Sequence, residues 1–444
     1  MDRSLLSAVS GIDANQTWLD VIGNNIANAN TTGFKQDNVS FGDLLSQQIQ
    51  GATAPNPPSL GGVDTVSVGT GVKTVAVTPD ESQGTLQQTN NPADVYINGE
   101  GYLIAQSQGT PLYTRDGTLM FDSNGNMVTP TGAFVQGWEA QNGVINTALP
   151  SGNLTIPVGL AIPPRATANV NVGGNLPGDS INTTQETATV NVYDTQGNEV
   201  SVLMTFTRNT AQDHGASGYA GSPSTQAWDL TATINNGATP ILASTELDFN
   251  LSGVLLGANN GTKLPNATGA EAGVLQLPTT ASNPDYLGGI LNSFNLNLPA
   301  TAAGQNDLTQ FAGSATAQAL SQDGYATGTL ASLSIGDTGI ITGAFTNGQS
   351  LQLGQLAMAN FANPQGLQAV GNNMWEGTAN SGIALVGTAG SGGRGTLTGG
   401  ALEASNVDMS TQLTNMVVAQ TSYQANTRVV TTDATVLNSL IQMA

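Results

Sequence analysis

The fold is decided by the first stretch with helical periodicity, Leu5–Lys35, LLSAVSGIDANQTWLDVIGNNIANANTTGFK. Steps of alternating three and four residues through it reach a row of apolar side chains, which predicts a helix that packs along one face. We expect the helix over about residues 4–30, because the Asn- and Thr-rich segment that follows ends in Gly33 and favours a left-handed cap or a turn. The row consists of Leu5, Ala8, Ile12, Leu19, Ile22, Ile26 and Ala29, and Asn15 interrupts it.

The same periodicity returns at the other end of the chain. Ser405 and Asp408 have the S-x-x-D spacing of a capping box, so a helix of about 36 residues is expected to begin just after them. Two terminal helices with apolar rows need partners along those rows. The second row consists of Leu413, Met416, Tyr423, Val430, Ala434, Leu437, Ile441 and Ala444, and Gln420 and Thr427 interrupt it.

The faces opposite these rows are nearly free of charge. Residues 1–30 have four charged side chains and residues 405–444 have three, and the polar positions are otherwise Asn, Gln, Ser and Thr. Uncharged polar groups can be buried when each is hydrogen-bonded, whereas a buried unpaired charge costs several kcal/mol. We therefore expect each helix to be packed on several sides by other copies of the chain, and to be frayed in a monomer. The alternative is one intramolecular pair of terminal helices that lies on a globular domain.

The chain is long, weakly charged and acidic. Its 444 residues predict roughly two to four domains. Charged residues make up 9% of the chain, against about 25% in typical soluble proteins. The net charge is -21 and only nine residues are Lys or Arg. Nucleic acid is therefore an unexpected partner, because phosphate binding needs a clustered basic surface.

Cysteine is absent, which excludes disulfides and thiolate metal sites. The N-terminal residues lack the basic region, continuous apolar run and small-residue cleavage site of a secretory signal. No apolar run reaches the roughly 18 residues that a membrane-spanning helix needs. The sequence thus predicts neither a cleaved signal peptide nor membrane insertion, and any export must use another route.

Between the two helices the chain has short alternating runs typical of β-strands. Clear examples are 72–77, 95–104, 188–193 and 202–206. No amphipathic helices are interleaved with them, so we expect antiparallel sheets of hairpins. The predicted fold class is α+β and mainly β, with terminal α-helices in a coiled-coil-like core and antiparallel β-domains in the middle. Six Asn-Gly pairs predict two-residue hairpin turns, at Asn98, Asn124, Asn142, Asn236, Asn260 and Asn347.

Proline and glycine clusters indicate the domain limits. Changes near 162–164 and near 298–299 predict that an outer β-domain is inserted into an inner one, distal to both termini. The predicted divisions are a terminal helical core (1–30 with 406–444), an extended connector (31–72 with 385–405), an inner β-domain (73–165 with 307–384) and an outer β-domain (166–306).

No constellation of catalytic or metal-binding residues emerges. His214, the only histidine, lies in a turn-rich stretch and is interpreted as an exposed loop residue. Residues 122–126, DSNGN, alternate oxygen ligands as calcium loops do, but Ala133 stands where a bidentate Glu is needed, which favours a hairpin turn. The glycine-rich segment 390–400 lacks the G-K-[ST] end of a phosphate-binding loop and is predicted to be a flexible connector. We therefore predict that the chain is not an enzyme and has no cofactor.

Six segments of the chain together carry a family resemblance. They are Leu5–Lys35, quoted above, ALEASNVDMSTQLTNMVVAQTSYQANTRVVTT (401–432), YTRDG (113–117), VQGW (135–138), SQDGY (321–325) and NFANPQGL (360–367). In these segments the chain resembles bacterial flagellar axial proteins of the rod and hook class. The likeness covers both ends and most of the predicted inner β-domain.

The resemblance implies a helical tube of identical subunits, in which paired terminal helices line a central channel and the β-domains form outer shells. The implied partners are further copies of the chain, a distal rod protein, a hook-filament junction protein, a hook cap and the flagellar type III export apparatus. The implied location is the extracellular hook of the bacterial flagellum, reached without a cleaved signal peptide. Some relatives cross-link their subunits through a cysteine and a lysine, which a chain without cysteine cannot do.

Within this class the segment 166–306 favours a hook subunit, which transmits motor torque through a short tube while it bends. Distal rod proteins share both ends but are shorter and lack such an insertion. Outer surfaces rich in amides and hydroxyls would let contacts between subunits shift, because each exchanged hydrogen bond costs about 1 kcal/mol. The alternative from another class is a secreted β-rich adhesin, which explains the acidic middle but not the uncharged terminal helices.

Overall fold

The computed structural model describes residues 2–52, 54–55, 61–62, 64–141, 143–157, 159–212, 226–234, 240–259, 274–277, 293–299 and 307–443. These residues form two compact units. Unit 1 consists of Met1–Val158, Ser332–Ala344 and Ser350–Ala444, and unit 2 of Gly159–Ala331 and Phe345–Gln349. As predicted, the structure is mainly β with one long helix near each end of the chain.

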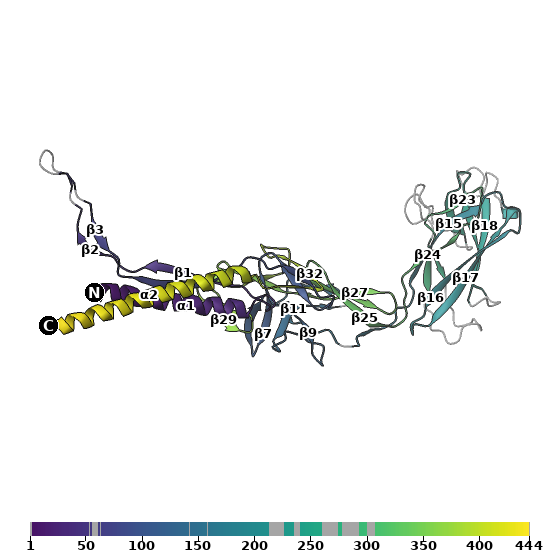
Figure 1. Ribbon diagram of the computed structural model, residues 1–444. Coiled ribbons are helices and arrows are strands. Elements are labelled where there is room, and N and C mark those ends of the chain that lie inside the picture. Colours follow the sequence, from purple (N-terminus) through teal and green to yellow (C-terminus); the bar gives the residue numbers. More distant parts are fainter. Residues whose placement is uncertain are drawn as a thin grey trace. The chain divides into compact units, whose positions relative to one another are not determined.

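The two helices of unit 1 are α1 (Asp2–Ala27) and α2 (Met409–Met443), which lie side by side in opposite directions (Figure 1). The Ser4 hydroxyl near the start of α1 donates a 2.7 Å hydrogen bond to Asp433 near the end of α2. Helix α1 ends three residues earlier than expected, and the chain then turns to Gly33, whose φ of 68° is the left-handed conformation that the sequence predicted. The described helices are therefore an antiparallel pair.

The start of α2 corrects one sequence-based expectation. The capping residue is Asp408, whose Oδ1 accepts hydrogen bonds from the backbone N–H groups of Ser410 (2.9 Å) and Thr411 (3.4 Å). Ser405, the predicted cap, only accepts a bond from the Val407 N–H. The expected start of the helix just after Asp408 is confirmed, but the S-x-x-D pattern placed the cap three residues too early, because Asp is as good a cap as Ser.

A two-stranded ribbon packs along α1. Its strands are β1 (Asp37–Asp43) and β4 (Val72–Pro79), which pair antiparallel. Trp18 of α1 meets Phe41 of the ribbon edge to face, with ring centroids 5.9 Å apart. Between the ribbon strands, β2 (Gln47–Gln50) and β3 (Val66–Val68) form a second antiparallel pair whose side chains are all exposed.

The rest of unit 1 is an inner β-domain built on one large sheet. Seven strands follow one another as β26-β27-β11-β7-β8-β30-β29. Aromatic and apolar side chains pack on the sheet, among them Tyr102, Tyr113, Trp138 and Phe361. The bounds are β7 (Tyr102–Ser107), β8 (Thr110–Thr114), β11 (Phe134–Gln141), β26 (Ile340–Phe345), β27 (Ser350–Leu356), β29 (Gln368–Gly371) and β30 (Met374–Glu376).

Short strands extend this domain. The pairs β6–β32 and β5–β33 bring the C-terminal segment against the N-terminal half of the domain. The bounds are β5 (Leu86–Gln88), β6 (Val95–Asn98), β9 (Met120–Phe121), β10 (Met127–Val128), β12 (Val144–Ile145), β13 (Gly152–Asn153), β28 (Met358–Asn360), η2 (Pro364–Gly366), β31 (Leu385–Gly387), β32 (Thr396–Gly399) and β33 (Ala401–Glu403). The prediction that 390–400 is a flexible connector is thus wrong in its second half, which pairs with β6 as β32.

Unit 2 is a sandwich of two sheets. One sheet is fully antiparallel, in the order β16-β17-β18-β19-β20, and the other has the order β21-β22-β15-β23 with β24 beside β15. Both contribute to one core, whose largest buried side chains are Trp228, Phe206, Phe249 and Phe294. The bounds are β15 (Asn169–Pro177), β16 (Gln185–Tyr193), β17 (Glu199–Arg208), η1 (Thr210–Gln212), β18 (Gln226–Ile234), β19 (Pro240–Phe249), β20 (Leu255–Asn259), β21 (Val274–Leu277), β22 (Phe294–Asn297), β23 (Leu308–Phe311) and β24 (Gln318–Gln322). Strands β14 (Ala161–Ile162) and β25 (Gly328–Ile335) pair with each other and belong to neither sheet of the sandwich.

Two features of unit 2 differ from the sequence-based expectation. Strand β15 runs parallel to β22 and β23, so this sheet is mixed and not antiparallel. More than a hundred residues separate β15 from β22, and a connection of that length does not force the antiparallel pairing of a hairpin. Strands β23 and β24 also pair with β15, so they belong to unit 2, although the predicted outer domain ended at residue 306. The finer division into core, connector, inner and outer domains remains a prediction.

The Asn-Gly pairs do not form the predicted two-residue turns where the structure describes both residues. At Asn124 and Asn347 the chain makes hairpins with longer loops, in which only the following glycine has positive φ. A two-residue type I′ turn needs positive φ at both positions. Asn98 ends β6, which pairs with β32 and not with the next strand. Asn142, Asn236, Asn260 and His214 lie outside the described residues.

Candidate functional site

The apolar row of α1 is only partly covered by the rest of the chain. Ala8 and Ile22 are buried. Leu5, Ile12, Leu19 and Ile26 are half-buried. Two large apolar side chains beside the row, Leu6 and Val9, are exposed. A single chain therefore leaves much of the apolar surface of α1 in contact with water.

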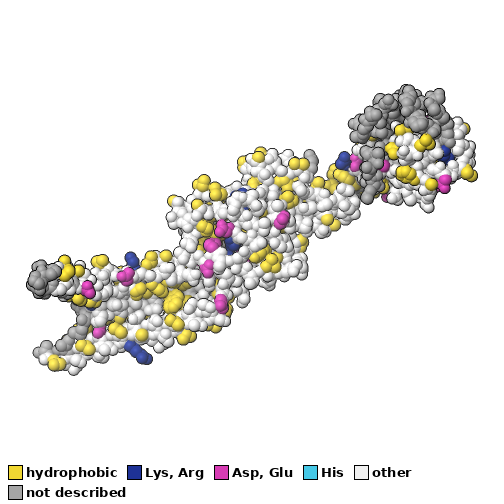
Figure 2. Space-filling model, turned by 90° about the horizontal axis from the view of Figure 1, so that it is seen from above, with side chains coloured by type: hydrophobic (Ala, Val, Ile, Leu, Met, Phe, Trp, Pro, Cys, Tyr) yellow, Lys and Arg dark blue, Asp and Glu magenta, His cyan; other side chains and the backbone are white. Residues whose placement is uncertain are grey.

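The row of α2 is covered even less. Met416, Tyr423 and Val430 are half-buried. Leu413 is 50% exposed, Leu437 38% and Ile441 73%. Ten residues of α2 follow Asp433, whereas only two residues of α1 precede its partner Ser4, so the end of α2 extends about 12 Å beyond α1. Figure 2 shows that blue and magenta side chains are sparse in unit 1, and that yellow ones reach the surface of its helical part.

Small and amide side chains lie where α1 and α2 approach each other closely. A Cβ on Gly11 would lie 2.6 Å from Nδ2 of Asn426, so the helices approach closely at this glycine. Asn25 and Gln412 are both buried, and their amides meet at 3.5 Å. Ala419 is fully buried. Sequence reasoning missed this row, although its signal was present: Ser4, Gly11 and Asn25, like Asp433, Asn426 and Gln412, are spaced by multiples of seven.

A buried charge cluster lies where the helices join the inner β-domain. Lys35 Nζ is 2.7 Å from Glu403 Oε1, and Arg115 Nη1 is 3.5 Å from Glu403 Oε2. The side chains of Lys35, Arg115 and Glu403 are 3%, 4% and 1% exposed. Glu403 also accepts a hydrogen bond from the Gly84 N–H at 2.8 Å, and Lys35 donates one to the Ser82 carbonyl at 2.7 Å. We call Lys35, Arg115 and Glu403 the junction cluster.

The backbone around the junction cluster is equally close. The Gly33 N–H donates a 2.8 Å hydrogen bond to the Glu403 carbonyl. A Cβ on Gly33 would lie 2.9 Å from the Arg115 carbonyl carbon, and φ at Gly33 is positive, so only glycine fits there without strain. The segment after α1, the segment before α2 and the turn after β8 therefore meet at one point.

Amide side chains tie the helix ends to the same place. Asn25 mimics a backbone partner for Asp37, since its Oδ1 accepts the Asp37 N–H and its Nδ2 donates to the Asp37 carbonyl, both at 2.9 Å. Gln412 of α2 donates to the Gln36 side chain at 3.1 Å. Asn406 accepts the Gln36 N–H at 2.8 Å and donates to the Asp80 carbonyl at 2.9 Å. The contacts of Gln412 and Asn406 span more than 300 residues of sequence, which is why local patterns could not reveal them.

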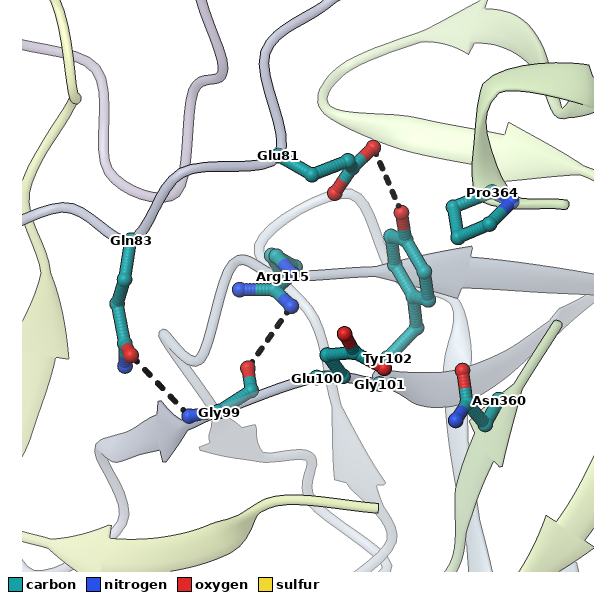
Figure 3. Close-up of a pocket in the computed structure, with 9 residues that line it drawn as sticks. All are labelled: Glu81, Gln83, Gly99, Glu100, Gly101, Tyr102, Arg115, Asn360 and Pro364. Carbon is teal, nitrogen blue, oxygen red and sulfur yellow. Dashed lines mark hydrogen bonds between the residues drawn. The ribbon is translucent and has the colours of Figure 1, made fainter. Parts of the chain in front are cut away.

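A cavity of about 200 Å³ lies beside the junction cluster (Figure 3). Tyr102 donates a 3.0 Å hydrogen bond to Glu81, and Arg115 Nη2 donates one to the Gly99 carbonyl at 2.9 Å. The Arg115 guanidinium also lies 5.4 Å from the centre of the Tyr102 ring. Burial raises the pKa of Tyr102 above its usual range. Burial, and then the neighbouring charge of Arg115, lower the pKa of Lys35 despite its contact with Glu403.

In the part of the chain that the structure describes, no group of three or more His, Asp or Glu could hold a metal ion. The segment 122–126 is a turn, in which Asp122 Oδ1 accepts the N–H groups of Asn124 and Asn126 at 2.8 Å. None of the helices in the described part is long and apolar enough to span a membrane. The candidate site is the incompletely covered apolar surface of α1 and α2, together with the junction cluster where the helices join the inner β-domain.

Four family models match the chain in succession. They are the flagella basal body rod protein (residues 5–35), the flagellar hook protein FlgE/F/G D1 domain (96–175), the flagellar basal body protein FlaE D2 domain (163–325) and the flagellar basal body rod FlgEFG protein C-terminal region (398–443). The first and last matches contain the two apolar rows, and Lys35, Arg115 and Glu403 fall in three different matches.

Curated relatives match over the full length. The chain is 36% identical to the flagellar hook protein FlgE of Treponema pallidum, with 100% of both chains covered. It is 35% identical to the flagellar hook protein FlgE of Salmonella typhimurium, with 99% of this chain and 100% of the relative covered. The fold is similar to the crystal structure of the Helicobacter pylori flagellar hook protein FlgE2, with a TM-score of 0.51, 14% identity, and 70% of this chain and 99% of that chain covered.

Proposed function

The chain belongs to the family of bacterial flagellar hook proteins, and from that premise we propose how it works as a structural subunit of the hook. The hook reading prevails over the distal rod protein and the adhesin, since hook proteins match the whole chain. The family consists of axial subunits that form a polymer in the flagellum.

The terminal helices are proposed to form the core of the polymer. Leu5, Ile12, Leu19 and Ile26 of α1 and Leu413, Leu437 and Ile441 of α2 keep exposed apolar area in one chain. Covering this area by helices of neighbouring copies stabilises the polymer by about 25 cal/mol for each Å² of apolar surface. Ala8, Ile22, Met416, Tyr423 and Val430 would complete each helix pair. The incomplete burial of the two rows is the observation that carries the proposal.

The β-domains are proposed to form the outer shells, with unit 2 (Gly159–Ala331 and Phe345–Gln349) outermost. Rigid helical packing at the centre transmits torque, while amide- and hydroxyl-rich outer surfaces exchange hydrogen bonds as the tube bends. Neighbours at the two ends would be the distal rod protein and the hook-filament junction protein. We further propose that the tube grows under a hook cap and lies outside the cell. The chain would reach this place through the flagellar type III export apparatus, without a cleaved signal.

Electron microscopy of the purified, concentrated protein tests the core of the proposal. We expect tubes of uniform diameter, with or without added cap protein as a nucleus. A chain that stays monomeric under both conditions, with α1 and α2 protected from proteases, contradicts it. Bending is tested separately by resolving individual subunits around a curved tube: identical outer contacts on the inner and outer curves contradict the exchange of hydrogen bonds.

A further inference from the structure

We infer that the junction cluster of Lys35, Arg115 and Glu403 is a positioning lock, which fixes the direction in which the two terminal helices leave the inner β-domain. The inference rests on the proposed function only in its consequence, namely that torque passes between the helical core and the β-domains through this point. The geometry itself belongs to a single chain.

The three residues come from the three segments that a lock must join. Lys35 lies eight residues after the end of α1, and Glu403 six residues before the start of α2. Arg115 follows the last residue of β8, a central strand of the inner sheet. The Glu403 carboxylate therefore contacts Lys35, in the segment that follows α1, and Arg115, at the end of a sheet strand. The backbone of Glu403 itself leads into α2. Moving either helix relative to the sheet would break a contact of Glu403.

Stability alone does not explain such a cluster. Burying three charges carries a desolvation penalty that their attraction offsets only when the geometry is excellent and every polar atom is satisfied. Here Arg115 Nε, Arg115 Nη1 and Glu403 Oε2 are buried without a hydrogen bond. Apolar side chains of similar size would fill the same space at a smaller cost, because they need no partners. What the charges add is direction, since an apolar contact tolerates rotation and sliding that an ion pair with backbone hydrogen bonds does not.

The neighbouring contacts make the lock two-sided. Tyr102, whose ring lies against the Arg115 guanidinium, and the Gly99 carbonyl hold Arg115 to the sheet. The Ser82 carbonyl and the Gly84 N–H hold Lys35 and Glu403 to the segment that connects β4 with β5. The Asn25 and Gln412 amides then join the helices to the residues next to Lys35. The lock thus connects the ribbon, both helices and the sheet through side chains that have little freedom.

The test separates direction from stability. Spin labels at Thr421→Cys, an exposed position of α2 outside its apolar row, and at Val144→Cys on the inner β-domain report the helix direction as a distribution of distances, and the chain has no other cysteine to interfere. Both positions are exposed. The labels are measured in the purified full chain, and again in polymers that contain a large excess of unlabelled chain. The triple variant Lys35→Met, Arg115→Met, Glu403→Leu removes all three charges while keeping the volume.

We expect the triple variant to melt no lower than the parent, but to show a distance distribution about twofold wider. Glu403→Gln, which keeps the shape of the side chain and strands two buried cations, is expected to widen the distribution and to lower the melting temperature by roughly 10 °C. The matched control is Arg165→Met, which removes the partly exposed pair with Asp323 at 3.8 Å and should change neither readout.

An unchanged, narrow distribution in both the triple variant and Glu403→Gln overturns the inference, whatever happens to the melting temperature. If the triple variant fails to fold, Glu403→Gln alone decides, through the same distribution. Tube formation by the parent chain tests the proposed function independently, since the label distances are also measured in the single chain. If the parent chain forms no tubes but its variants show wider distance distributions, the positioning role of the junction cluster is supported. Only its role in transmitting torque is then contradicted.

Discussion

The terminal helix pair and the sandwich of unit 2 show opposite ways of burying apolar surface. Unit 2 closes its own core, with Phe206, Trp228 and Phe249 fully buried between two sheets. The helix pair buries mostly small side chains and leaves Leu437 and Ile441 exposed. The first is complete as a single chain and the second is not. The difference teaches where a partner is to be sought: we propose it along the helices, because several exposed apolar side chains lie there in one row.

The largest effect should come from a charge on the incomplete surface. Leu437→Asp would place an unpaired carboxylate where we propose that another copy packs, at a cost of several kcal/mol per subunit, or at least about a hundredfold in the critical concentration for assembly. Sedimentation of polymers measures this. The melting of the isolated chain should be unchanged, because Leu437 is 38% exposed there.

The control for Leu437→Asp is Ile181→Asp, which makes the same chemical change at a side chain of unit 2 that is 78% exposed. It should assemble close to normally. If Leu437→Asp forms normal polymers, the row of α2 does not pack against other copies of the chain. Leu19→Asp on α1 should behave as Leu437→Asp does.

The next effect concerns the complete core. Trp228→Ala should destabilise unit 2 by about 3–5 kcal/mol, because it removes a fully buried aromatic side chain and leaves a cavity. Calorimetry that resolves the transition of unit 2 measures it. The helix pair should still assemble, so polymers should form at temperatures below the lowered transition. Loss of polymers at those temperatures would mean that the two regions are not independent.

Lowering the pH should change the stability contributions of two carboxylates, Asp194 in unit 2 and Asp116 in unit 1, in opposite directions. Burial raises the pKa of Asp194 in unit 2, but bonds from the Asn198 side chain and from the backbone of residues 196–198 outweigh it and lower the pKa below the usual 3.8. Its contribution to stability is present above pH 3.8 and is lost as the pH falls through the lowered value. Burial raises the pKa of Asp116 in unit 1, so its contribution is present below pH 3.8 and is lost as the pH rises through the raised value.

Asp194→Asn should therefore lower the melting temperature of unit 2 at pH 7. When the pH falls, this melting temperature should decrease less in the variant than in the parent chain. Asp116→Asn should leave the melting of unit 1 at pH 7 unchanged or raise it. Melting curves between pH 2.5 and pH 7 compare the two variants. The same sign for both would contradict the assigned pKa directions.

The smallest effect lies at the start of α2. Asp408→Ala removes the cap of the Ser410 and Thr411 N–H groups and should cost about 1 kcal/mol of helix stability. Asp408→Asn, which keeps an acceptor oxygen, is the matched control and should cost less. The two readouts are circular dichroism of the chain and the critical concentration for assembly. If Ser405→Ala lowers helix stability as much as Asp408→Ala, Ser405 is a cap after all, as the sequence suggested.

The sequence predicted the elements with strong periodicity and missed contacts between distant residues. The helices followed from spacing, since Leu5 to Ile26 and Leu413 to Ile441 repeat with the helical period. The parallel pairing of β15 with β22 could not be foreseen, because the connection between them is too long to set direction. The junction cluster was also hidden: Lys35, Arg115 and Glu403 each lie in a recognised segment, but nothing local shows that a single carboxylate serves both cations.

If the apolar rows hold the subunits together, neighbouring copies must cover them in the polymer. A cryo-electron microscopy map of tubes assembled from the purified chain, with side chains resolved, measures this directly. We predict that Leu413, Leu437 and Ile441 are buried against helices of neighbouring copies. A map in which these three side chains face solvent or the open channel, while other surfaces hold the subunits together, would contradict the account.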